Sequence, residues 1–187
     1  MNTKTLLPVL LIPSCVMLVP LAALLFKAEG FAWSPADFVF CWVFIAGTVF
    51  AYKLVTSRAT NSAYRVATAV GVTTGLVLVW INGAVGLIGS EDNPANLMYG
   101  GVLAIGLVGA VLARLEPLGM SRALFATAFA QFLVPVIAFA IRRPDFNPGV
   151  AQVFALNFFF VVMFAVSGLL FRQAGTQPGG VDVRRTA

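Results

Sequence analysis

Six long apolar runs, separated by short polar connectors, constrain this chain more than any other feature of its sequence. Each run has about 20 residues or more, the length that an α-helix needs to cross the hydrocarbon core of a bilayer. No run carries a charge in its central part, and the connectors hold nearly all the Lys, Arg, Asp and Glu. Because backbone groups in lipid must hydrogen-bond within their own segment, the runs are predicted to be helices. The predicted spans are residues 5–26, 36–57, 64–89, 95–114, 120–141 and 149–171.

The composition supports a membrane setting. Of the 187 residues, 60% are hydrophobic and 10% are charged, whereas a soluble globular domain has about 45–50% apolar and about 25% charged residues. We therefore predict an all-α polytopic membrane protein, with one domain over residues 1–172 and six transmembrane helices arranged as three hairpins. Residues 173–187 are polar and rich in Gly, and this composition predicts a disordered cytoplasmic tail.

The distribution of Lys and Arg predicts the orientation. If the N-terminus is cytoplasmic, nine of the 12 basic residues fall on the inner side and three on the outer side. The positive-inside rule then places both termini in the cytoplasm. The basic start followed by Cys15 is similar to a lipoprotein signal, but the apolar run continues to Phe26. A cleaved signal is followed by a polar segment, so we interpret the first run as a retained helix.

In each of the three outer connectors, a side chain that carries an oxygen atom stands directly before a proline. Such a side chain accepts a free N–H of the first helical turn, and proline at the first position has no N–H to leave unpaired. The predicted N-caps are therefore Ser34, Asn93 and Asn147. An Asn-Pro-Ala pore motif of the aquaporin type is disfavoured, because both Asn-Pro pairs here fall on the same predicted face of the membrane.

The connector GSEDNPANLMYGG, residues 89–101, gathers carboxylates and carboxamides. Carboxylates before a helix stabilise its N-terminus, so a solvated capping loop is one interpretation. A cation or partner site is the other, although calcium takes six to eight oxygen ligands. Two arginines on the outer side either contact lipid phosphates or pair with the acidic residues of this loop. The candidate outer-loop site comprises Glu91, Asp92, Asn93, Asn96, Arg142 and Arg143.

Three carboxamides fall well inside the predicted spans, near the membrane midplane. Polar groups at that depth face protein or water rather than lipid, so the three are able to form one cluster. They either make interhelical hydrogen bonds or line a polar binding site or pore constriction. The members of this candidate midplane cluster are Asn82, Gln131 and Asn157.

Small residues in the third and fourth runs predict close helix packing. The third run contains Gly71 and Gly75, and the fourth contains Gly106 and Gly109. Small residues at such spacings let membrane helices approach closely. We therefore expect the third and fourth helices to form a tight pair at the centre of the fold.

The stretch WINGAVGLIGSEDNPANLMY, residues 80–99, resembles a signature of small bacterial integral membrane proteins without an assigned function. It covers about a tenth of the chain. The resemblance implies a location in the bacterial cytoplasmic (inner) membrane. It implies no activity.

Reactive groups are scarce, and this favours a non-enzymatic protein. The sequence has no His, which removes the commonest general base and metal ligand, so no catalytic, metal or cofactor residues are predicted. No basic, aromatic-interleaved patch suits nucleic acid. The expected partners are membrane lipids and either other membrane-protein subunits or further copies of this chain. A bound lipid or pigment would leave little signature.

Two functional hypotheses follow from these observations. The first is an accessory or interaction subunit that packs against partners in a membrane complex. The alternative is a passive channel or facilitator for a small solute or ion, with the three carboxamides as its constriction.

Overall fold

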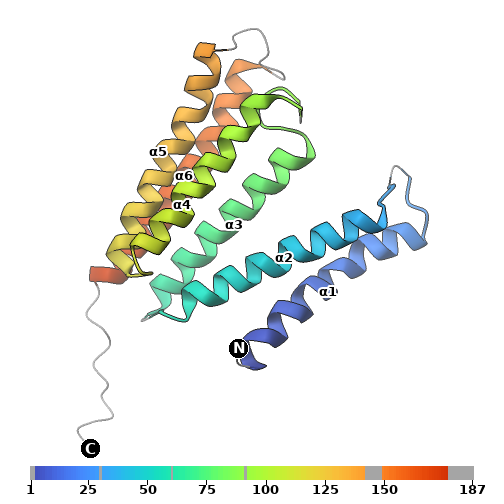
Figure 1. Cartoon of the computed structure of the whole chain (residues 1–187), viewed down its shortest axis with the longest axis horizontal. Helices are drawn as coiled ribbons and strands as arrows, with labels where there is room; N and C mark the ends of the chain where they lie inside the picture. Colours follow the sequence, from blue (N-terminus) through green and yellow to red (C-terminus); the bar gives the residue numbers. More distant parts are fainter. Residues whose placement is uncertain (1–2, 30, 60, 91, 142–148, 177–187) are drawn as a thin grey trace, which may run out of the picture. The chain divides into compact units, whose positions relative to one another are not determined.

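The computed structural model describes residues 3–29, 31–59, 61–90, 92–141 and 149–176, and every regular element in these ranges is helical. Six of the helices are long and apolar enough to cross a membrane, so the predicted all-α class and the six apolar spans are confirmed (Figure 1). The helices are α1 (Thr3–Leu25), α2 (Pro35–Thr56), α3 (Ser62–Ala84), α4 (Met98–Leu112), α5 (Pro117–Ile141) and α6 (Val150–Thr176), and the short 3-10 helix η1 (Pro94–Leu97) precedes α4.

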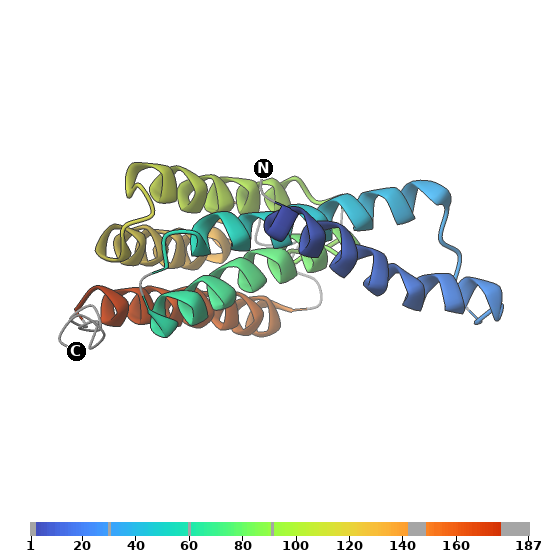
Figure 2. The same ribbon diagram turned by 90° about the horizontal axis from the view of Figure 1, so that it is seen from below.

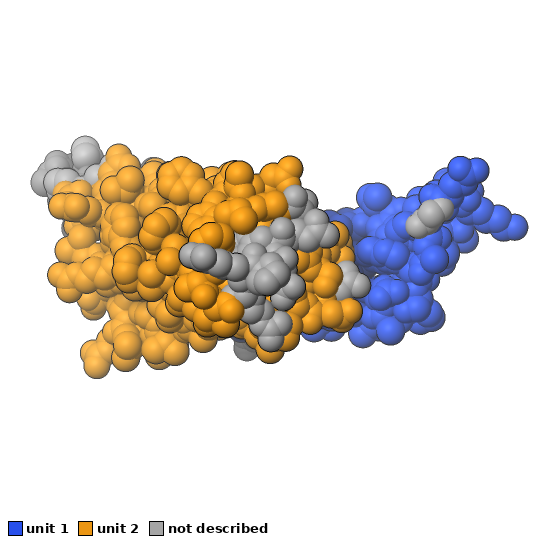
Figure 3. All heavy atoms as spheres, turned by 90° about the horizontal axis from the view of Figure 1, so that it is seen from above, with its two compact units in different colours: residues 1–57 blue, residues 58–187 orange. Residues whose placement is uncertain are grey.

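The chain forms two compact units, which are described separately: residues 1–57 and residues 58–187. Figure 3 gives each unit its own colour. The first unit contains α1 and α2, and the second contains α3 to α6.

In the first unit, α1 packs against α2. The indole Nε1 of Trp42 in α2 donates a hydrogen bond of 3.1 Å to the hydroxyl of Ser14 in α1. The Ser14 hydroxyl also donates a hydrogen bond of 2.7 Å within its own helix, to the carbonyl of Leu10. At the start of α2, the Ser34 hydroxyl accepts the backbone N–H of Asp37, and the Asp37 carboxylate accepts that of Ser34. These reciprocal bonds form a capping box.

The second unit is built around the pair α5 and α6, which make the most extensive contact in the chain. Helix α3 packs against α6, and α4 packs against α5; Figures 1 and 2 show these helices side by side. The expected tight pair of α3 and α4 is not present, since these two helices share few contacts. The closest approaches of their glycines are to other helices: Gly71 of α3 faces α6, and Gly106 and Gly109 of α4 face α5, whereas Gly75 of α3 makes only an ordinary contact with Leu103 of α4.

Two glycines show where the close approaches lie. A Cβ on Gly71 of α3 would lie 2.8 Å from the hydroxyl of Ser167 in α6. A Cβ on Gly109 of α4 would lie 2.6 Å from the Cβ of Ala123 in α5. The hydroxyl of Ser167 donates to the carbonyl of Ala67 at 2.8 Å, so α3 and α6 are also joined by a hydrogen bond. The small residues therefore serve the α3–α6 and α4–α5 contacts.

Helix boundaries differ from prediction at two places. The helix predicted to reach residue 89 ends at Ala84, because Gly86 and Gly89 adopt φ values of 70° and 75°, which belong to the left-handed region that only glycine enters readily. At the other end of the chain, residues 173–176 were predicted to belong to a disordered tail. They form the last turn of α6 instead.

Candidate functional site

A network of three buried polar side chains joins α4, α5 and α6. The Oδ1 atom of Asn157 accepts hydrogen bonds from the hydroxyl of Tyr99 at 2.8 Å and from Nε2 of Gln131 at 2.9 Å. Each of the three side chains is at most 1% exposed. We call Tyr99, Gln131 and Asn157 the carboxamide network. Polar groups in lipid require such partners, so the network stabilises the contact between three helices.

The backbone sets the orientation of the Asn157 amide. Its Nδ2 donates to the carbonyl of Val153, one turn earlier, at 2.8 Å. The opposite orientation would bring Oδ1 against that carbonyl, where two acceptors would repel. With Oδ1 directed at Gln131, the Gln131 amide must present its Nε2. Its Oε1 then has no hydrogen-bond partner among the described residues.

The two carboxamides of the network lie at different positions along their helices. Asn157 is about 10 Å along the axis from Val150, at 1.5 Å per residue. Gln131 lies about 15 Å from Ile141 by the same measure. Gln131 is therefore close to the centre of α5, whereas Asn157 is nearer to the start of α6 than to its end.

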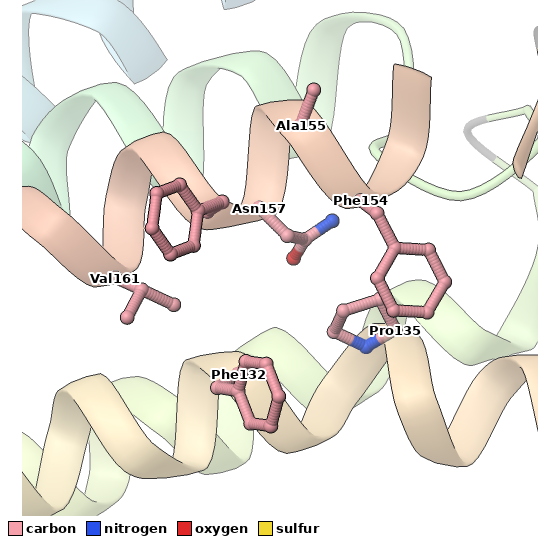
Figure 4. A pocket seen from close by; sticks show the side chains of 7 residues that line it. Phe132, Pro135, Phe154, Ala155, Asn157 and Val161 are labelled. Atoms are coloured by element: carbon pink, nitrogen blue, oxygen red, sulfur yellow. The ribbon is translucent and has the colours of Figure 1, made fainter. Parts of the chain in front are cut away.

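An apolar crevice of about 300 Å³ lies beside the network, between α5 and α6. In Figure 4 the Asn157 amide points from α6 into the space facing Phe132 and Pro135 of α5. The rings of Phe132 and Phe158 are 46% and 59% exposed, so the crevice opens on the outer surface of the helices. We call this cavity the α5–α6 crevice. It is lined by Phe132, Pro135, Phe154, Ala155, Asn157, Phe158 and Val161.

Asn82 does not join the other two carboxamides. It lies in the last turn of α3, two residues before Ala84, because the helix ends earlier than predicted. Its Nδ2 makes a long hydrogen bond of 3.4 Å to the carbonyl of Asn96, and its buried Oδ1 has no partner among the described residues. The predicted cluster is thus reduced to Gln131 and Asn157, with Tyr99 as the third member.

Asn96 holds the connector between α3 and η1 in place. Its Oδ1 accepts the backbone N–H of Ile88 at 3.0 Å, and its Nδ2 donates to the carbonyls of Ile88 and Ser90 at 3.3 and 2.7 Å. Asn96 is only 4% exposed. Its amide is therefore occupied by the backbone of the loop, which is a structural role rather than that of a cation ligand.

Three of the outer-loop candidates lie around one cavity. A hollow of about 360 Å³ is lined by Asp92, Asn93 and Asn96, together with Asn82 from the end of α3. Asn93 is the N-cap of η1, since its Oδ1 accepts the N–H of Ala95 at 3.0 Å. Within the described ranges, no group of three or more His, Cys, Asp or Glu side chains is placed to hold a metal ion. Glu91, Arg142, Arg143 and the predicted cap Asn147 lie outside the described residues.

The sequence analysis did not identify Tyr99 as a member of the carboxamide network. Tyr99 is 1% exposed and lies in the first turn of α4. The signal that could have identified it is its hydroxyl, because a buried tyrosine hydroxyl needs a hydrogen-bond partner and two carboxamides were already expected nearby. The crevice was missed as well, since its walls come from two helices whose relative rotation the sequence does not specify.

A comparison of this chain with protein-family models, curated proteins and solved structures finds no match.

Proposed function

We propose that this chain is a non-enzymatic integral membrane protein that acts as an accessory subunit and packs against other proteins in a membrane complex. The observation that carries the proposal is the low burial of α1 and α2. Only two of the 22 residues of α2 are buried, against ten of the 25 residues of α5. The first unit therefore buries few side chains between its own two helices.

The three prolines inside α1 add to this argument. Pro8, Pro13 and Pro20 lie within the helix, and each lacks the N–H that would bond the carbonyl four residues earlier. In lipid, neighbouring helices are one usual source of compensating contacts for such carbonyls. A partner protein beside α1 would supply them.

The geometry supports a channel less well. Gln131 and Asn157 are hydrogen-bonded to each other and to Tyr99, and Asn82 stands apart at the end of α3. The three carboxamides therefore do not ring a common passage, which the hypothesis of a constriction required.

The charges of the second unit support the proposed orientation, with both termini in the cytoplasm. The proposed location in the inner membrane of a bacterium rests on the resemblance of residues 80–99 alone. Hydrogen bonds from Asn61 to the carbonyl of Ala174 and from Tyr64 to that of Leu115 tie together one end of the unit. The positive-inside rule assigns the cytoplasmic side to the end richer in Arg. The described arginines near this end are Arg58, Arg65, Arg114, Arg122 and Arg172.

The proposal is tested by extraction of the protein from its native membranes in a mild detergent, size separation and mass spectrometry of the co-migrating chains. We expect a partner of different sequence at fixed stoichiometry. Val43→Trp, on α2, should release it, whereas Val108→Trp, on α4, should not. The two valines are matched, since they are 58% and 57% exposed. Wild-type protein that migrates alone, or only with its own copies, would overturn the proposal.

A further inference from the structure

Two glycines of α6 define a line of close contact with α5. A Cβ on Gly168 would lie 3.3 Å from the ring of Phe125. A Cβ on Gly175 would lie 2.9 Å from the side chain of Leu118. Because residues seven apart share a helix face, the two contacts lie on one face of each helix. The later residue of α6 faces the earlier residue of α5, so the helices run antiparallel. We call this line of contact the α5–α6 seam.

One arginine from each helix stands on this seam. Arg122 is four residues after Leu118 and three before Phe125. Arg172 occupies the equivalent position between the two glycines of α6. Residues three and four apart are neighbours on a helix surface, so both arginines lie on the contacting faces and at the same level. Both are exposed, which places them on the outer surface of the helix pair.

The two arginines are not neutralised by the protein around them. The described residues of the second unit contain five Arg, no Lys and two carboxylates, Asp92 and Glu116. Neither Arg122 nor Arg172 forms an ion pair with a carboxylate that the structure describes. Like charges on neighbouring helices repel each other. An anion placed between the two guanidinium groups would therefore be attracted by both.

The depth of the arginines matches the phosphate level of a bilayer. Arg122 is about 7.5 Å from Pro117, the first residue of α5, at 1.5 Å per residue. Arg172 is about 6 Å from Thr176, the last residue of α6, by the same measure. Arginine side chains near the end of a span extend to the interface, and guanidinium groups bind phosphate with paired hydrogen bonds. The phosphate of a lipid is therefore the anion that these two side chains meet.

The seam continues from the arginines to the α5–α6 crevice. Phe132, which lines the crevice, is seven residues beyond Phe125 on α5. Val161, which also lines it, is seven residues before Gly168 on α6. The distance along α6 from Arg172 to Val161 is about 17 Å, and one leaflet supplies about 15 Å of hydrocarbon, half the thickness of the bilayer core. An acyl chain that starts at the arginines therefore extends to the crevice.

We propose that the outer face of the α5–α6 seam binds a phospholipid with an anionic head group. Its phosphate lies between Arg122 and Arg172, and one acyl chain follows the seam to the α5–α6 crevice. The two arginines select the charge of the lipid, and the apolar walls of the seam hold the chain. The site uses only helices of the second unit, so it does not depend on the accessory role proposed from the first unit.

The test measures lipid binding to the full-length, delipidated protein in detergent by native mass spectrometry. Phosphatidylglycerol and phosphatidylcholine with the same acyl chains are titrated separately, and the fraction of protein with one bound lipid gives each dissociation constant. A basic residue near anionic lipid contributes a factor of about five in affinity, so we expect phosphatidylglycerol to bind about 25-fold more tightly. This comparison leaves the protein unchanged, so no folding defect complicates it. Equal affinities for the two lipids would overturn the proposal.

Matched arginine variants locate the site. Arg122→Gln and Arg172→Gln should each weaken the binding of phosphatidylglycerol about fivefold and leave that of phosphatidylcholine unchanged. Arg65→Gln removes the same charge from an exposed position in the first turn of α3, away from the seam. It should change binding less than about twofold, the scatter expected of a surface substitution. Equal losses for all three variants would mean that overall positive charge attracts lipid without a defined site, and would overturn the proposal.

A head group without chains distinguishes a lipid ligand from a soluble phosphate. Glycerophosphoglycerol carries the same phosphate diester as phosphatidylglycerol and has no acyl chains. At tenfold molar excess over the lipid, it should leave the bound phosphatidylglycerol in place. Displacement of the lipid would show that Arg122 and Arg172 bind a water-soluble phosphate and that the seam holds no chain, which would overturn the proposal.

Discussion

The two units of this chain use their apolar residues in different ways. In the second unit, buried hydroxyls and carboxamides join four helices, and close glycine contacts bring α3 to α6 and α4 to α5. In the first unit, one hydrogen bond between Trp42 and Ser14 links two helices whose large side chains are mostly exposed. Apolar burial adds little to helix association in lipid, where packing and hydrogen bonds decide it. The second unit has such contacts among its own helices, and the first unit has few between its two helices.

The largest effect is expected from Asn96→Leu in the second unit. The substitution removes three hydrogen bonds to the connector and leaves the buried N–H and carbonyl of Ile88 without their partner. We expect the free energy of unfolding to fall by about 3 kcal/mol. The free energy of unfolding is measured by steric trapping of the protein in bicelles. Asn93→Ala removes one N-cap hydrogen bond and should lower the free energy of unfolding by about 1 kcal/mol. Equal losses for the two variants would contradict the conclusion that Asn96 holds the connector in place.

Asn157→Leu should follow in size. It removes the acceptor of both Tyr99 and Gln131, and interhelical hydrogen bonds in membranes contribute about 0.6–1.7 kcal/mol each, so a loss of about 2 kcal/mol is expected. The same unfolding assay applies, with Gln152→Leu on the exposed surface of α6 as the control. A loss no greater than that of the control would show that the carboxamide network does not stabilise the second unit.

Gly109→Ala tests the glycine contacts. The new Cβ would lie 2.6 Å from the Cβ of Ala123, and such overpacking costs about 1–3 kcal/mol, which the better helix propensity of Ala offsets by about 1 kcal/mol. A net loss of about 1 kcal/mol is expected. Gly101→Ala, also in α4, meets nothing within 4 Å and should be neutral or stabilising. A Gly109→Ala protein as stable as Gly101→Ala would mean that α4 and α5 pack less closely than the structure shows.

The smallest effect is expected in the first unit, from Ser14→Ala. This change removes the acceptor of the Trp42 indole, but the bond is exposed, and such bonds contribute about 0.5–1 kcal/mol at most. Cysteine cross-linking between α1 and α2 in the membrane should report an unchanged helix pair. If Ser14→Ala instead destabilised the protein as strongly as Asn157→Leu, the contrast between the two units would fail.

The general fold could be predicted from the sequence because apolar length and charge position act locally. Each of the six spans depends on one continuous apolar run, and the caps Ser34 and Asn93 depend on residues within one turn of each other. The pairing of helices could not be predicted, since Gly71 and Gly109 indicate a close contact without indicating with which helix. For the same reason Asn82 was grouped with Gln131 and Asn157. Its separation follows from the left-handed glycines Gly86 and Gly89, which end α3 early.

Tyr99 shows a related limit. Nothing in the sequence near Tyr99 marks it as a partner of Asn157, because only the approach of α6 brings the Asn157 Oδ1 atom to 2.8 Å from its hydroxyl. The partners of the Asn157 Oδ1 atom, Tyr99 and Gln131, come from two other helices, so they depend on the same three-helix contact.

Photo-cross-linking in intact native membranes tests most directly the claim that the first unit packs against another protein. Benzoylphenylalanine is introduced in place of Val43 on α2 and, in a separate protein, in place of Val108 on α4. The two positions are almost equally exposed, at 58% and 57%. We expect Val43→benzoylphenylalanine to give a discrete adduct with a chain of different sequence, and Val108→benzoylphenylalanine to give only lipid adducts. Lipid adducts alone at both positions, or adducts only with a second copy of this chain, would contradict the accessory role.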